Sequence, residues 1–216
     1  MNVEKLIKIS RASFLNGIRI HFDSICLFNN SSYPSAFYLS VLAKEEIGKS
    51  MAFSGEAWIY RRKLGYKAKD VIKNYKGWYL DRICNHKNKQ AEFVESTWKN
   101  HTRKIEKIFL GEYENAKWKS IFVDLNKNRR MVLPLSKIKE NKSKEQITIL
   151  NDYLLNLCYF VKLDRADRFT DFSINIVEKL LDNELLEKLE KNWNFKSKMC
   201  EKLIREWVRI LNNKNE

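Results

Sequence analysis

The chain has 216 residues, of which 44% are hydrophobic and 12% aromatic, so it can form a sizeable core and is not intrinsically disordered. Its six glycines and two prolines are too few for a protein of many short strands, and they favour long helices. The formal net charge of +14 suggests an acidic partner such as nucleic acid. The excess of lysine over arginine, 29 against 12, is equally consistent with the coding bias of an AT-rich genome.

The first half of the chain has apolar residues at helical spacing. This spacing predicts a first helix over residues 3–28, which the polar run from Asn29 to Ser32 ends. A second helix is predicted over about 34–63, with Pro34 in its first turn. A third long helix is predicted over about 78–109, ending near Gly111.

Residues 118–134 differ in character from the helices around them. Ile121 to Val123 favour extended structure, Asn126 to Asn128 favour a turn, and Pro134 ends the segment. We therefore expect a short irregular or hairpin-like insertion there, followed by helices over about 144–168, 171–191 and 195–212. The fold class is all-α, with one domain over 1–216 in which 171–216 form a C-terminal helical extension without a motif.

The sequence shows no pattern typical of a metal site, a cofactor site or a membrane segment. The four cysteines form no CxxC pair and have no histidine at metal-ligand spacing, which favours a reduced cytoplasmic protein with neither a metal nor a cofactor. The N-terminus lacks the apolar run of a signal peptide, and no stretch approaches 18 apolar residues. We expect no membrane association.

The second helix is apolar on two sides, so it should be buried on two sides. One stripe consists of Leu39, Leu42, Ala43, Phe53 and Ala57. The opposite face consists of Phe37, Val41, Gly48, Met51, Ala52, Gly55 and Ile59. Because Gly48 and Gly55 lie seven residues apart on that second face, a neighbouring backbone can come close. The face around Gly48, Met51, Ala52 and Gly55 is either core or a homodimer interface, and we favour the dimer slightly.

Two glutamates of this helix are candidate site residues. Glu46 falls within the first apolar stripe, where a carboxylate needs a partner, unless the helix is rotated so that Glu46 lies at the core edge. Glu45 and Lys49 fall at the edge of the stripe, four residues apart, and can form a pair.

The third helix offers the partner. Lys87 lies within its apolar stripe, and Arg82, His86 and Lys89 share one flank. We predict a Glu46–Lys87 contact with His86 close by; the alternative is that the long side chain of Lys87 leaves the core. His21, on the apolar stripe of the first helix, is interpreted as a structural histidine.

Three segments carry a resemblance to a known family. Residues 38–49, YLSVLAKEEIGK, residues 86–89, HKNK, and Phe122-Val123-Asp124 followed by Pro134 resemble, in order and spacing, motifs of the AbiV family of abortive-infection proteins. The resemblance covers about residues 5–170. It implies a HEPN-type helical bundle, usually dimeric, and a polar centre that consists of Glu45, Glu46, Lys49, His86, Lys87 and Lys89.

The chain departs from the catalytic HEPN ribonucleases at one point. Those enzymes have four to six residues between an arginine and a histidine, whereas three lie between Arg82 and His86. The two residues still share a helix face. They could cleave RNA without a metal, because histidine transfers protons near neutral pH and arginine stabilises the phosphorane.

The sequence leaves two functions open. The first is an abortive-infection protein that acts on RNA or the translation machinery after a phage-encoded activator protein appears. Its RNA binding should fall steeply with salt concentration. The second is a non-enzymatic protein-binding module whose polar centre is structural. The +14 charge favours the first, and the shortened Arg82–His86 spacing favours the second.

Overall fold

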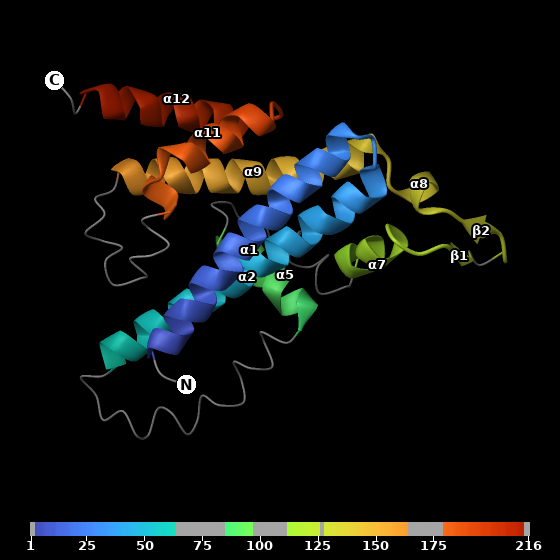
Figure 1. Ribbon diagram of the computed structural model, residues 1–216, viewed down its shortest axis with the longest axis horizontal. Coiled ribbons are helices and arrows are strands. Elements are labelled where there is room, and N and C mark those ends of the chain that lie inside the picture. Colours follow the sequence, from blue (N-terminus) through green and yellow to red (C-terminus); the bar gives the residue numbers. More distant parts are fainter. Residues whose placement is uncertain (1–2, 64–84, 97–111, 126–127, 164–178, 214–216) are drawn as a thin grey trace.

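Helices form nearly all of the chain that the structure, a computed structural model, describes: residues 3–63, 85–96, 112–125, 128–163 and 179–213. In chain order the elements are α1 (Val3–Asn29), α2 (Tyr33–Lys63), α5 (His86–Ser96), α7 (Glu112–Lys119), β1 (Asp124–Leu125), β2 (Met131–Val132), α8 (Pro134–Lys137), α9 (Glu140–Leu163), α11 (Asn183–Asn192) and α12 (Lys198–Asn213) (Figure 1). The expected all-α class with a short hairpin-like insertion is confirmed.

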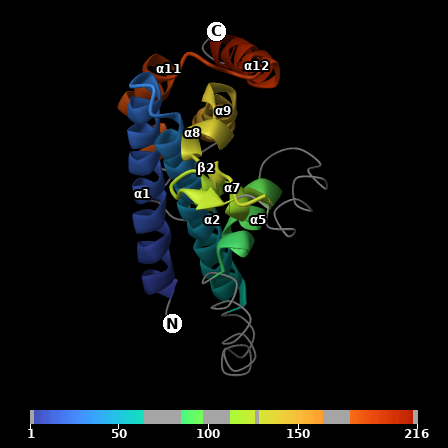
Figure 2. The same ribbon diagram turned by 90° about the vertical axis from the view of Figure 1, so that its right-hand side faces the viewer.

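Helices α1 and α2 form a long antiparallel hairpin (Figures 1 and 2). The tight turn between them contains Ser31, whose φ of 59° lies in the left-handed region. Small residues let the two helices approach closely. Ser10 Oγ donates to the carbonyl oxygen of Ser50 at 2.8 Å, and a Cβ on Gly17 would lie only 2.7 Å from Ile47 Cδ1. The two helices are therefore closely packed against each other along the hairpin.

Helix α9 crosses this hairpin and carries the main core (Figure 1). Its Leu150 and Leu154 are fully buried in the cluster that contains Ile47 of α2. Leu189 of α11 and Cys200 of α12 belong to the same cluster, so both C-terminal helices contribute side chains to the core around α9.

Three predicted segments need correction or lie outside the described residues. Of the helix expected over 171–191, residues 171–178 lie outside the described residues, and the remainder is interrupted at Asp182, whose side chain caps α11 by accepting from the backbone N–H of Glu184 at 2.9 Å. Of the helix expected over 78–109, only α5 lies within the described residues. The insertion expected from residue 118 begins later, since Trp118 and Lys119 belong to α7.

The hairpin-like alternative is confirmed for the rest of that insertion. Strands β1 and β2 are antiparallel, with Asp124 opposite Val132 and Leu125 opposite Met131. Arg129, with a φ of 57°, lies in the connection between them. The hairpin projects beside α7 and α8 at one end of the bundle (Figure 1).

Two further expectations concern membranes and thiols. Among the described residues, no helix is both long and apolar enough for a membrane span. Cys26, Cys158 and Cys200 are free thiols, and burial raises the pKa of Cys158 to about 12. Cys84 lies outside the described residues.

Candidate functional site

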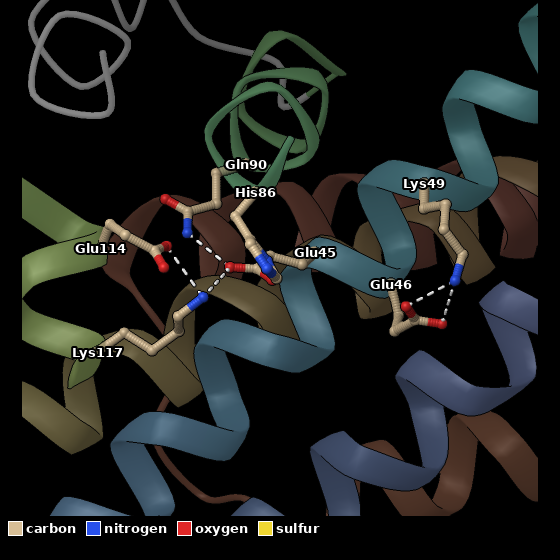
Figure 3. A network of polar contacts seen from close by, with 7 residues as sticks. All are labelled: Glu45, Glu46, Lys49, His86, Gln90, Glu114 and Lys117. Carbon is tan, nitrogen blue, oxygen red and sulfur yellow. Dashed lines mark hydrogen bonds and ion pairs between the residues drawn. The ribbon is translucent and has the colours of Figure 1, made fainter. Parts of the chain in front are cut away.

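Polar side chains from α2, α5 and α7 meet around the carboxylate of Glu45 (Figure 3). His86 Nδ1 lies 2.6 Å from Glu45 Oε2, Gln90 Nε2 donates to Oε1 at 2.7 Å, and Lys117 Nζ donates to Oε1 at 3.0 Å. Glu45 is only 3% exposed. A buried carboxylate is costly unless it is paired and hydrogen-bonded, and here three donors satisfy it.

Lys117 is the buried cation of this centre. Its side chain is 1% exposed, and its Nζ lies between Glu45 Oε1 and Glu114 Oε2, the latter 2.9 Å away. The contact with Glu114 is an ion pair without hydrogen-bond geometry. The ammonium group joins α7 to α2 and forms an ion pair with both carboxylates.

His86 combines a fixed ring with access to solvent. It is the first residue of α5, and its side chain is 48% exposed. Since an ionised carboxylate can only accept, Glu45 fixes the tautomer with the proton on Nδ1 and leaves the lone pair of a neutral ring on Nε2. A histidine held in this way is suited to proton transfer.

Glu46 belongs to a second, separate contact. It accepts from Lys49 Nζ at 2.8 and 3.0 Å and from Asn16 Nδ2 of α1 at 3.1 Å. The Glu45–Lys49 pair expected from the sequence is therefore wrong, because Lys49 pairs with Glu46. Successive residues on a helix point about 100° apart, so Glu45 faces α5 and α7 while Glu46 faces α1 (Figure 3).

The structure describes only some of the partners that the sequence predicted for Glu46 on the third helix. His86, placed near Glu46 in that prediction, contacts Glu45 instead. The side chain of Lys87 and the whole of Arg82 lie outside the described residues, so the Glu46–Lys87 contact and the Arg82–His86 pair stay predictions.

The second face of α2 lies against α5 at Gly48. A Cβ on Gly48 would lie 2.1 Å from the carbonyl oxygen of Lys89, so a backbone of the same chain makes the close approach there. Met51 packs on the core, and its Sδ lies 3.6 Å from the hydroxyl of Tyr153. Among the described residues, nothing lies within 4 Å of a Cβ on Gly55. Ala52 and Gly55, both half-buried, are the open part of this face.

Sequence reasoning missed Gln90, Glu114 and Lys117. Gln90 lies one helical turn after His86, a spacing that places the two on the same face and could have suggested a shared partner. Glu114 and Lys117 have the i,i+3 spacing of an ordinary surface ion pair, and nothing in the sequence indicates that Lys117 is buried.

Three side chains of the centre are also potential metal ligands. One donor atom each of Glu45, His86 and Glu114 lies within 4.8 Å of the others. The ammonium group of Lys117 already contacts both carboxylates, so a divalent cation would have to displace it. The donor set therefore fits a lysine-bridged centre better than a metal site.

Comparison with known proteins places the chain in a family. A family model of the HEPN type described as AbiV matches residues 5–154, more than two thirds of the chain. The chain belongs to the AbiV family. Neither the curated proteins nor the solved structures gave a match. The matched region contains the whole centre around Glu45 and leaves out α11 and α12. Membership of the AbiV family confirms the resemblance found in the sequence and implies a role in abortive-infection defence.

Proposed function

We propose that this AbiV-family protein is a metal-independent endoribonuclease that arrests the phage-infected cell. The single observation that carries the proposal is the Glu45–His86 contact of 2.6 Å, with Glu45 buried and His86 half-exposed. This arrangement orients an accessible imidazole for proton transfer. The formal charge of +14 supports binding to the phosphates of RNA.

In the proposed reaction His86 Nε2 takes the proton from the ribose 2′-hydroxyl. The 2′-oxygen attacks the adjacent phosphorus, the bond from phosphorus to the 5′-oxygen breaks, and a proton is delivered to that leaving oxygen. The products are a 2′,3′-cyclic phosphate and a 5′-hydroxyl. Glu45 is a positioning residue that stabilises the charged ring, and Arg82 is proposed to stabilise the phosphorane.

The cellular setting of the proposal follows from the family. Abortive infection requires an inactive state before infection, so we propose activation by a phage-encoded protein, in the cytoplasm, with RNA or the translation machinery as target. We also propose a homodimer, for which the open part of the α2 face, Ala52 and Gly55, is the candidate contact.

The test compares RNA in phage-infected cells that carry the wild type, His86→Ala or Glu46→Gln. We expect discrete fragments with 2′,3′-cyclic phosphate ends in the wild type and in the Glu46→Gln control, and at least a hundredfold fewer with His86→Ala. The purified, activated protein should cleave equally well with a chelator present.

A second candidate function is the non-enzymatic binding module. The observation in its favour is the burial of Lys117 between two carboxylates, which is also how a purely structural centre is built. If His86→Ala cells stay protected while RNA stays intact in both strains, this second function replaces the first.

A further inference from the structure

Exposed apolar side chains gather on the projecting end of the bundle. Of the eleven large hydrophobic residues that are exposed among the described residues, six lie between 118 and 135. These six define what we call the arm surface: Trp118, Phe122, Val123, Met131, Leu133 and Leu135. Met131 and Leu135 are 66% and 64% exposed, more than any other residues of this set. A concentration of this kind is typical of an interaction site rather than of scattered surface residues.

The arm surface is held in place by the bundle. It begins at Trp118, next to the buried Lys117 that anchors α7 to Glu45, and it ends in α8, after which Ile138 is 1% exposed in a cluster with Phe37 and Val41 of α2. Trp118 and Phe122 stack on each other, with ring centroids 5.8 Å apart. Both ends of the segment are therefore fixed while its apolar side chains stay exposed, as expected of a preformed docking site.

The charge around the arm surface indicates the nature of its partner. Residues 118–139 contain six lysines and arginines against one aspartate. The side chains of Lys119, Arg129, Lys137 and Lys139 are exposed. Two copies of the chain that met through this surface would bring two basic segments together, which is unfavourable. The partner should therefore be acidic.

The apolar side chains of the arm surface favour a protein over a nucleic acid as the partner. Four of the six side chains, Val123, Met131, Leu133 and Leu135, are aliphatic, whereas bases stack on aromatic rings. Trp118, Met131 and Leu135 belong to α7, β2 and α8, and the other three residues lie in the connections between these elements, so the six do not form one strand edge. A partner that docks by its side chains can therefore contact more of the arm surface than a partner that adds a strand to the hairpin. An amphipathic helix presents an apolar stripe of the required kind.

We propose that the arm surface docks an acidic amphipathic helix of another protein. The apolar face of that helix lies on the arm surface, and its acidic flanks face Lys119, Lys137 and Lys139. The proposal stands independently of the ribonuclease activity, because it uses no residue of the centre around Glu45.

The probe is a fluorescein-labelled peptide of about 18 residues, five helical turns, with leucine at i, i+3, i+4 and i+7 and glutamate elsewhere. A peptide of the same composition with scrambled spacing, and an oligouridylate of similar length, serve as comparison ligands. Binding to the full-length protein is measured by fluorescence anisotropy, and self-association by analytical ultracentrifugation.

The decisive variant is Met131→Gln with Leu135→Gln. The matched control is Met199→Gln with Val208→Gln, two exposed apolar residues of α12. We expect the dissociation constant of the amphipathic peptide to rise at least tenfold in the first variant and less than twofold in the control. The pair Lys137→Glu and Lys139→Glu should weaken binding as well, and added salt should weaken binding to the wild type.

Three results would overturn the proposal. The first is that the wild type fails to distinguish the amphipathic peptide from the scrambled one. The second is that oligouridylate, rather than the peptide, loses affinity in the Met131→Gln, Leu135→Gln variant, which would make the arm surface an RNA site. The third is that this variant converts a dimer into a monomer, which would make it a contact between copies of the chain.

Discussion

Glu45 Oε2 and His86 Nδ1 lie 2.6 Å apart, although 41 positions separate the two residues in the sequence. Glu45 is buried in the middle of α2, while His86 begins α5 with half of its side chain exposed. The pair therefore connects the interior of the bundle to its surface. Because the same carboxylate also accepts from Lys117 and Gln90, any change of its charge acts on α2, α5 and α7 together.

The first prediction concerns the charge of Glu45. Glu45→Gln keeps the shape of the side chain but leaves Lys117 with one carboxylate and His86 without an anionic acceptor. We expect the free energy of unfolding to fall by about 3 kcal/mol, measured by urea denaturation, because one partner of a buried pair is removed. The proposed RNA cleavage should fall at least tenfold.

The control for Glu45→Gln is the neighbouring Glu46→Gln. Glu46 and Lys49 are 19% and 24% exposed, so their pair is worth about 1 kcal/mol or less. Equal effects of the two substitutions would contradict the special role of Glu45.

The second prediction concerns Lys117 and its coupling to Glu45. Lys117→Met removes a buried charge and leaves Glu45 and Glu114 facing each other without a cation, so it should cost about 3 kcal/mol. In the Glu45→Gln, Lys117→Met double variant the two losses should overlap. The combined cost should be smaller than the sum of the single costs by about 1–3 kcal/mol. Additive costs in a urea-denaturation cycle would show that the contact contributes nothing of its own.

Much of the fold could be predicted from the sequence because it depends on local periodicity. The first two helices were placed within one or two residues, since a long 3.6-residue repeat with a polar break defines both of them. The break at Asp182 was missed because a side-chain cap changes the backbone at one residue and leaves the apolar repeat almost intact.

The candidate site was predictable only in part. The stretch around Glu45 and His86 was found from acidic and basic residues within apolar stripes. Which of Glu45 and Glu46 meets His86 depends on a helix rotation of about 100°, within the error of a pattern-based estimate. Lys117 was unpredictable, because its burial results from the docking of α7 on α2, a tertiary contact with no local signature.

The third prediction compares two glycines of α2. A Cβ on Gly48 would lie 2.1 Å from the carbonyl oxygen of Lys89, and a backbone atom cannot rotate away. Gly48→Ala should therefore displace α5, lower the free energy of unfolding by about 3 kcal/mol and reduce the proposed RNA cleavage by moving His86 away from Glu45.

Gly55→Ala is the matched control on the same helix. Among the described residues, no atom lies within 4 Å of the added Cβ, so the gain in helix propensity should raise stability by about 0.5–1 kcal/mol. Thermal denaturation of the two variants should shift in opposite directions. A parallel loss of stability would mean that Gly55 also meets a close neighbour.

The fourth prediction concerns His21, which is fully buried and whose Nε2 lies 2.9 Å from Asn151 Oδ1. Burial is the main cause that lowers the pKa of His21 from 6.5 to about 4; Lys44 lowers it further, while the hydrogen bond to Asn151 raises it. Between pH 6.5 and about pH 4, the folded protein therefore keeps His21 neutral, whereas His21 of the unfolded chain binds a proton. This stabilisation is complete above pH 6.5 and is lost as the pH falls towards 4, by about 3 kcal/mol in total.

The measurement is the free energy of unfolding between pH 7 and pH 4, for the wild type and for His21→Gln, in which the amide can still bond Asn151. Carboxylates titrate in both proteins, so the difference between the two curves isolates His21. We expect the advantage of the wild type over the variant at pH 7 to shrink as the pH falls, since glutamine takes up no proton in either state. Parallel curves for the wild type and His21→Gln would mean that His21 binds its proton inside the folded protein.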